Sequence, residues 1–282
     1  MKRASLLLLP AAVLGASYHD VISSLVIRWW TDPDYSHGFF VPLFSLIFLW
    51  EKRASFTADG LRSSWAGLPV MLLAAVLRAL GHLLLSPYLG YVSLLVMLGG
   101  LVLLCCGKRV VRQAWFPMSF LVLMLPLPRL VYESVALPLQ QFSAIFASAV
   151  LEGLRVPVLR EGNVIHFAGK TLEVVQACSG IRLLTGFVAM SIVIAHLQRK
   201  PLWLKGVLVA SSIPVAVAAN ALRVTGTGIL YYTSGRGSAE GFFHAFSGWL
   251  LFVLALGALL LESYLLSRAA AFVRARWKGG SG

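Results

Sequence analysis

The chain has 282 residues, of which 59% are hydrophobic and 12% are charged, and its mean hydropathy is +0.82. Because a soluble domain is about one-quarter charged, this composition excludes an ordinary soluble globular protein. The formal net charge of +13 comes from Lys and Arg gathered between apolar runs, which indicates membrane topology and contact with anionic lipid before it indicates nucleic-acid binding. The apolar runs are long and do not alternate with polar residues, so they predict an all-α polytopic membrane protein.

The basic clusters predict how the apolar runs are oriented. Lys2 and Arg3 place the N-terminus in the cytoplasm, because cytoplasmic loops are rich in Lys and Arg. The opening MKRASLLLLPAAVLGA is similar to a signal peptide, but the apolar run continues toward Ile27 and favours an uncleaved first span. The last four residues, GGSG, have the composition of a cloning scar, and no prediction is based on them. We expect one membrane domain over residues 1–282, with both ends in the cytoplasm and about eight transmembrane helices. The seventh helix begins near residue 202 and ends before a Gly-rich outer loop at 225–241. The other seven are expected at residues 6–27, 39–50, 65–85, 89–106, 114–125, 181–197 and 242–266.

Two further segments do not have the pattern of a simple span. Residues 129–154 are helical in pattern but contain Glu133, Pro138 and Glu152. If this segment crossed the membrane, every later basic cluster would fall outside, so we expect an amphipathic or re-entrant helix along the outer interface. Residues 156–176 contain short β-branched runs separated by turn residues, which predict a small periplasmic β-hairpin or three-stranded meander.

The stretch 174–196, VVQACSGIRLLTGFVAMSIVIAH, contains the first candidate catalytic residue. Cys178 lies where an extended segment gives way to an apolar helix. A Cys at a helix N-terminus can have a lowered pKa, and therefore more of the nucleophilic thiolate. Ser179 or Gly180 can cap this helix, and Gly180 allows close approach of a substrate backbone. The alternative is a structural Cys at the end of a span.

Two more candidates are predicted on the same outer face of the membrane. Arg223 lies near the outer end of the seventh expected span, and His244 opens the eighth. Asn220 is three residues before Arg223 on the same helical face, where it can orient the guanidinium. Taken singly, Arg223 can be a residue that snorkels to the headgroups and His244 an interfacial histidine. Since sequential helices usually pack together, Cys178, Arg223 and His244 can meet in one pocket.

These three residue types suit acyl transfer through a thioester. A Cys178 thiolate can attack a carbonyl carbon, and His244 can carry a proton to the leaving amine near neutral pH. Arg223 stays cationic and can stabilise the oxyanion of the tetrahedral intermediate. The sequence identifies no third group that would orient His244.

Other polar residues have weaker predictions. Tyr35, Ser36 and His37 form an outer loop that either lines a substrate groove or is a hydrogen-bonded turn. Arg182, one helical turn after Cys178, either lowers the thiol pKa, binds an acidic substrate residue, or is a buried structural ion. No His, Cys, Asp and Glu cluster has metal-ligand spacing, and no Gly-rich loop has the context of a nucleotide site, so we expect no metal and no cofactor.

Four strings of the sequence resemble the exosortases, of the exosortase/archaeosortase family. They are DPDYSHGFFVPLFSLIFLW at 32–50, ACSGIR at 177–182, NALRV at 220–224 and FHAFSGW at 243–249. The resemblance implies that Cys178, Arg223 and His244 are the catalytic set. It also implies a bacterial inner-membrane protein whose site faces the periplasm. The implied substrates are exported proteins with a C-terminal signal made of a Pro-Glu-Pro motif, a transmembrane helix and a basic tail.

The resemblance implies cleavage near that motif and transfer of the protein to another molecule, in cells that often make exopolysaccharide. Its implied partners are these protein substrates and membrane lipid, and not nucleic acid. Two other functions stay open from the residues alone. One is a multi-pass transporter with Arg223 and His244 in a polar pathway, although we find no internal repeat or paired broken helices. The other is a non-catalytic subunit of a polysaccharide export system.

Overall fold

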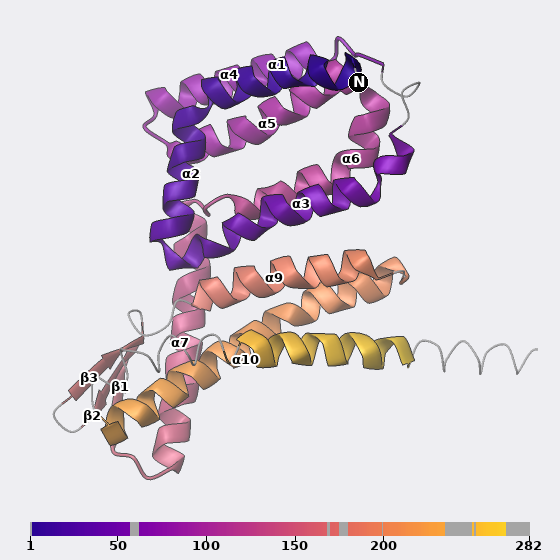
Figure 1. Cartoon of the computed structure of the whole chain (residues 1–282). Coiled ribbons are helices and arrows are strands. Elements are labelled where there is room, and N and C mark those ends of the chain that lie inside the picture. Colours follow the sequence, from indigo (N-terminus) through magenta and orange to yellow (C-terminus); the bar gives the residue numbers. More distant parts are fainter. Residues whose placement is uncertain are drawn as a thin grey trace, which may run out of the picture. The chain divides into compact units, whose positions relative to one another are not determined.

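The structure is a computed structural model that describes residues 2–56, 62–167, 170–174, 180–198, 200–234, 250 and 252–268 (Figure 1). The chain divides into two compact units, residues 1–128 and 129–282, and each unit is described by itself. The expectation of a single membrane domain stays a prediction. The described part is mostly helical and contains one small antiparallel sheet.

Unit 1 is built from helices joined by short turns. Its longest helices, α4 and α5, pack against each other as an antiparallel hairpin. Gly107 ends this hairpin with a φ of +88°, and a Cβ there would lie 1.8 Å from the carbonyl oxygen of Arg62, so the turn requires glycine. The elements of unit 1 are α1 (Lys2–Ser17), α2 (His19–Thr31), η1 (Pro33–Phe39), α3 (Phe40–Glu51), η2 (Arg53–Ser55), α4 (Gly67–Leu83), α5 (Pro87–Cys106), α6 (Lys108–Phe120) and η4 (Leu121–Met124).

The span expected over residues 6–27 is broken at Tyr18, directly before the polar residues His19 and Asp20. The helices on the two sides of the break are bent by 69°. Asp20 lies in the first turn of α2, where a carboxylate is favoured by the helix dipole, and it forms an ion pair with Arg78 of α4. His19 and Asp20, which interrupt the apolar run, therefore form the start of a new helix.

Several other expected spans are short helices in the structure. The helix α3 has 12 residues, α6 has 13 and α4 has 17. At about 1.5 Å per residue, a helix of 12 residues covers roughly 18 Å of a hydrocarbon core that is about 30 Å thick. Residues 114–125 in particular begin as α6 and tighten into the 3₁₀ helix η4.

Unit 2 contains the small sheet and the segments around the candidate site. Strand β2 pairs antiparallel with both β1 and β3, so that Ile165 lies opposite Arg160 on one side and Leu172 on the other. The chain therefore forms a three-stranded meander, one of the two arrangements expected for residues 156–176. The elements of unit 2 are α7 (Arg129–Gly153), β1 (Val158–Glu161), β2 (Val164–Phe167), β3 (Lys170–Glu173), α9 (Gly180–Leu197) and α10 (Leu202–Ser234), with a further helix over residues 252–268.

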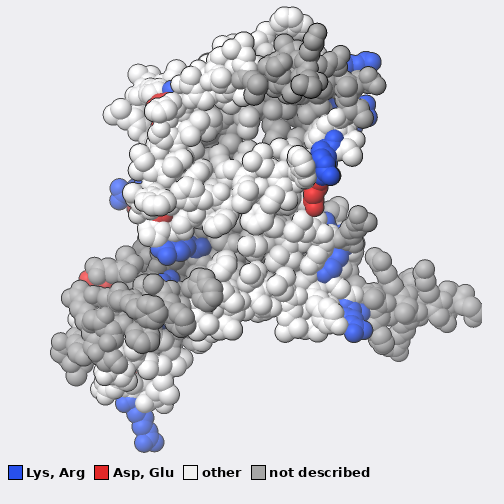
Figure 2. Space-filling model, viewed as in Figure 1, with Lys and Arg blue, Asp and Glu red and all other residues white. Residues whose placement is uncertain are grey.

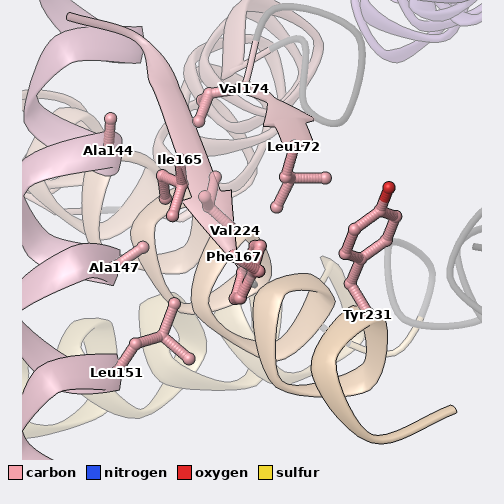
Figure 3. Close-up of a cluster of buried hydrophobic side chains, with 9 residues drawn as sticks. All are labelled: Ala144, Ala147, Leu151, Ile165, Phe167, Leu172, Val174, Val224 and Tyr231. Atoms are coloured by element: carbon pink, nitrogen blue, oxygen red, sulfur yellow. The ribbon is translucent and has the colours of Figure 1, made fainter. Parts of the chain in front are cut away.

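One face of the sheet packs on α7 and on the C-terminal half of α10 (Figure 3). Ile165, which is fully buried, and Phe167 point from β2 into this cluster because alternate residues of a strand share a face. Leu151 enters from α7 and Tyr231 from α10. The hydroxyl of Tyr231 also donates a hydrogen bond to the carbonyl of Thr171 at 3.2 Å. This core fixes the sheet to both helices.

The expected loop at residues 225–241 is wrong for its first ten residues, because α10 stays helical through Ser234. Val224 and Tyr231 pack against the sheet, and the hydroxyl of Thr225 donates a hydrogen bond to the carbonyl oxygen of Ala221 in the same helix. Packing thus outweighs the low helix propensity of Gly226 and Gly228. Residues 235–241 lie outside the described residues.

The helix α7 runs across the direction of α9 in unit 2 (Figure 1) and contacts both α9 and α10. The interfacial placement expected for residues 129–154 stays a prediction. By length and composition alone, α7 also meets the requirement for a span.

Among the described residues, four helices are long and apolar enough to cross a membrane, namely α5, α7, α9 and α10. The bent pair α1–α2 makes five if it is counted as one span. Most of the surface that Figure 2 shows for the described residues is uncharged, as expected for a protein in contact with lipid. The chain is therefore a membrane protein with several apolar helices, and eight spans remain an expectation.

Candidate functional site

The sequence-predicted residues fall partly inside and partly outside the described chain. Cys178, Ser179 and His244 lie outside the described residues. Asn220 and Arg223 lie on α10, and Arg182 lies half-buried on α9. The structure therefore describes α9 and α10, which would carry part of the site, together with three of its predicted polar side chains.

Asn220 is fully buried where α10 meets α7. Its side-chain Nδ2 donates a hydrogen bond of 2.8 Å to the hydroxyl oxygen of Ser143 on α7. Its Oδ1 is also buried and has no hydrogen-bond partner within the described part of the chain. A buried carbonyl oxygen without a donor costs free energy, so this acceptor is available to a donor group at the site.

The start of α9 touches the same asparagine. A Cβ placed on Gly180 would lie 2.9 Å from Nδ2 of Asn220 and 2.3 Å from Cδ2 of Leu139 on α7. Only a residue without a side chain allows α9 to begin this close to both neighbours. Gly180, Asn220 and Ser143 therefore form a contact point at which α7, α9 and α10 meet, and we call these three residues the three-helix contact.

Arg223 lies one helical turn beyond Asn220 and is only 6% exposed. A snorkelling arginine places its guanidinium at the protein surface, so this burial argues against the alternative considered for Arg223 from the sequence. Buried arginine side chains persist where polar groups satisfy them, and they keep their charge. The structure thus places a cation inside unit 2, on the helix that carries the three-helix contact.

Two residues of α7 belong to this region but were not predicted as site residues. Ser143 accepts the hydrogen bond from Asn220, and Gln140 accepts one of 3.2 Å from the side chain of Asn163, which lies in the turn between β1 and β2. Both are buried on the face of α7 that also buries Ala144. The signal that could have identified them is their spacing of three residues on a face otherwise made of small and apolar side chains.

Tyr35, Ser36 and His37 lie in unit 1, in the 3₁₀ helix η1. The Ser36 hydroxyl donates to the carbonyl of Pro33 within the same turn, at 2.9 Å. Nε2 of His37 lies 3.1 Å from the carbonyl oxygen of Leu123, and Tyr35 is buried. The described contacts are those of a hydrogen-bonded turn, and a role in lining a substrate groove stays a prediction.

Burial changes the acid–base behaviour of this turn. Burial lowers the pKa of His37 below its ordinary value, although hydrogen bonds with the backbone of Leu123 and Asp34 act in the opposite direction. Burial also raises the pKa of the Tyr35 phenol, partly opposed by the charge of Arg28. His37 is therefore held in its neutral form, in which one ring nitrogen can donate to the Leu123 carbonyl.

Among the described residues, no group of three or more His, Cys, Asp and Glu side chains could hold a metal ion.

The fold and the buried polar groups on α10 define the class of the chain, a polytopic helical membrane protein with ionisable groups inside it. Residues 29–261 match the family model described as "Transmembrane exosortase", so the chain belongs to the transmembrane exosortase family. No curated protein and no solved structure was found to match the chain. The resemblance predicted from the four sequence strings is confirmed, and membership in this family implies the processing of sorting signals.

Proposed function

We propose that the chain is a membrane-embedded cysteine transpeptidase that cleaves the C-terminal Pro-Glu-Pro-type sorting signals of exported proteins and transfers the proteins to an acceptor. The observation that supports this most is the three-helix contact. Cys178 precedes Gly180 by two residues, and two residues span at most about 7 Å of extended chain. Because Gly180 packs on Asn220, the proposed nucleophile belongs to the segment that adjoins the face of α10 carrying Asn220 and Arg223.

The proposed reaction has two steps. The Cys178 thiolate attacks the scissile carbonyl carbon, and Arg223 stabilises the negative charge that forms on its oxygen. His244 gives a proton to the departing amine as the carbon–nitrogen bond breaks, which leaves the substrate as a thioester. A nucleophilic group of the acceptor then attacks the thioester, passes its proton to His244 and releases the Cys178 sulfur.

Asn220 is proposed as a positioning residue for this chemistry. Its amide nitrogen is bonded to Ser143, and its free Oδ1 can accept a hydrogen bond from a guanidinium or backbone N–H. Arg182 and Ser179 are proposed as supporting residues because they lie in the same ACSGIR string as Cys178.

We further propose that the site faces the periplasm of a bacterial inner membrane. The basic residues Lys200 and Lys205 lie at the ends of α9 and α10 remote from the three-helix contact, and basic clusters mark the cytoplasmic side. The exported protein substrates would then reach the site after translocation, while their C-terminal helix is still in the membrane.

The substitution Cys178→Ala tests the proposed function. We expect it to abolish processing of a co-expressed, tagged substrate bearing a Pro-Glu-Pro signal, while the variant inserts in the membrane at the normal level. The matched controls are Cys105→Ala and Cys106→Ala, which remove the other two thiols of the chain at the end of α5 and should leave processing intact. Normal processing by Cys178→Ala would contradict the enzyme proposal and favour a transporter or a non-catalytic export subunit.

A further inference from the structure

A second polar site lies in unit 1, at the junction of α2, α4 and α5. Two adjoining cavities, of about 290 Å³ and about 350 Å³, share Arg78 and His82 of α4 as lining residues. The first cavity is lined by further polar residues, and the second mostly by apolar ones. Neither cavity includes a residue of the proposed transpeptidase site, so this site is independent of that function.

The centre of the polar cavity is an ion pair with one unused donor. Nη2 of Arg78 lies 2.8 Å from Oδ1 of Asp20, and the guanidinium lies over the ring of Tyr18 at 4.4 Å from its centroid. The other terminal nitrogen, Nη1, is buried and has no hydrogen-bond partner among the residues that the structure describes. A buried charged donor without an acceptor is unfavourable, so binding of an acceptor from outside the chain at this nitrogen would be stabilising.

Further groups at the cavity wall can bind the same acceptor. The 20-residue helix α5 begins here at Pro87, and its N-cap residue Ser86 makes no side-chain capping hydrogen bond. Because residues of this first turn line the cavity, the partial positive charge of the helix N-terminus lies at the cavity wall. The hydroxyls of Ser24 and Tyr91, 2.8 Å apart, also line it. Arg78, the helix N-terminus and these hydroxyls together favour a phosphate group.

Asp20 determines which kind of phosphate compound fits. Its side chain is 54% exposed, and Arg78 uses only Oδ1 in the ion pair, so the carboxylate can also bind a second cation. A carboxylate beside the phosphate position repels a purely anionic group and attracts an ammonium group attached to the phosphate. The charges thus match a zwitterion in which a phosphate and a primary amine lie a few bonds apart.

The second cavity provides an apolar extension. Ala75, Ala79 and Met97 line it together with the Tyr18 ring. Arg78 lies five residues before the end of α4, about 8 Å along the helix at 1.5 Å per residue, which is headgroup depth for a helix that ends at the membrane surface. We propose that the two cavities bind one zwitterionic phospholipid with a primary amine, with its phosphate on Arg78, its ammonium on Asp20 and its acyl chain along Ala75 and Ala79.

Native mass spectrometry of the purified full chain in non-ionic detergent tests this proposal. Phosphatidylethanolamine, phosphatidylglycerol and inorganic phosphate are titrated separately. We expect the wild-type protein to bind phosphatidylethanolamine in preference to the other two. Arg78→Gln should weaken that binding by roughly tenfold or more, the loss expected for one charge-assisted hydrogen bond. Asp20→Asn should remove the preference over phosphatidylglycerol.

The chain offers a matched control for Arg78. Arg28 also pairs with an aspartate, Asp32, at 3.6 Å and also lies over a tyrosine ring, that of Tyr35, but it lines neither cavity. Arg28→Gln should leave lipid binding unchanged. Equal losses in Arg28→Gln and Arg78→Gln would overturn the proposal, and so would binding of inorganic phosphate as strong as that of the lipid.

Arg78→Gln could lose lipid binding because it fails to fold, so a second variant that keeps every charge is needed. Ala79→Phe fills the apolar cavity and should reduce phosphatidylethanolamine binding while the melting temperature stays near that of the wild type. Undiminished lipid binding by Ala79→Phe would contradict the placement of the acyl chain.

Discussion

At the residue scale, the three-helix contact is the feature on which the proposed site depends. Gly180 has no side chain, Asn220 is held by one hydrogen bond, and Ser143 supplies its acceptor. Each of these residues comes from a different helix. A change of a few tenths of an ångström at any of them moves the start of α9 relative to α10, and catalytic groups lose activity when they are displaced by about 1 Å.

The substitution Gly180→Ala tests this contact. The new Cβ would press on Leu139 and on the Asn220 amide, which can move only by giving up its bond to Ser143. We expect a loss of about 1–3 kcal/mol in the free energy of unfolding and a large fall in substrate processing. The control is Gly186→Ala on the same helix, where the nearest atom, of Phe252, lies at an ordinary 3.6 Å. Equal behaviour of the two variants in thermal denaturation and processing assays would show that the contact is not tight.

His37 makes the stability of unit 1 depend on pH. Its pKa is lowered by burial, so the unfolded chain binds this proton more readily than the folded one. Stability should therefore rise with pH up to and through the ordinary value of 6.5 and be lost on acidification below it. We expect melting temperatures measured between pH 5 and about 8 to fall less steeply on acidification for His37→Gln than for the wild type. Parallel curves would argue that His37 is not held neutral.

The sequence predicted some residues of the candidate site, but it could not predict the contacts between residues far apart in the chain. Asn220 and Arg223 were predicted on one helical face because a spacing of three residues places them there. Ser143 was not predicted as the partner of Asn220, because that contact joins residues 77 positions apart. The turn at Tyr35–His37 was ambiguous in the sequence, because the contact of His37 is with the backbone of Leu123, 86 positions away in the chain.

At the element scale, the C-terminal half of α10 and the sheet support each other. Glycine and threonine residues after Arg223 predict a loop by local propensity, yet the segment is helical because Val224 and Tyr231 bury their side chains against β2. The strands were predictable because short β-branched runs alternate with turns. The 3₁₀ helix η4, which ends the run at residues 114–125, was not predictable, since apolar composition alone does not show where a helix tightens.

Leu151→Ala tests the coupling between sheet and helices. Leu151 is fully buried among α7, β2 and α10, and loss of its side chain should lower the free energy of unfolding by about 2–5 kcal/mol. Hydrogen exchange of the strands should increase at the same time. The matched control is Leu137→Ala, also on α7 but with an exposed side chain, for which we expect an effect below about 1 kcal/mol. Protection of the strands equal to that of the wild type would mean that the cluster does not fix the sheet.

At the scale of the whole molecule, membership in the transmembrane exosortase family agrees with a chain of apolar helices whose charges concentrate between them. The membrane class followed from composition alone, because 12% charged residues cannot cover a soluble surface of this size. The number of spans did not follow, because helices such as α3 and α4 are apolar but shorter than the thickness of the hydrocarbon core.

Thiol labelling in intact cells tests the proposed orientation. A membrane-impermeant maleimide supplied from the periplasmic side should modify Cys178 in preference to Cys105 and Cys106, which end α5 beside the basic start of α6. The Cys178→Ala variant should lose this labelling, which identifies the modified residue. Modification of Cys178 only from the cytoplasmic side would reverse the topology.

The length of α10 has a consequence for the choice of cleavage position. Its 33 residues extend about 50 Å, and Arg223 stands about 32 Å from Leu202, close to the thickness of the hydrocarbon core. For the proposed transpeptidase, this helix acts as a ruler measured from the inner surface. A sorting signal lengthened by one helical turn between its membrane helix and its cleavage motif would place the scissile bond about 5 Å beyond Arg223, away from the inner surface. The tolerance of processing to such insertions therefore measures how strictly α10 determines the cleavage position.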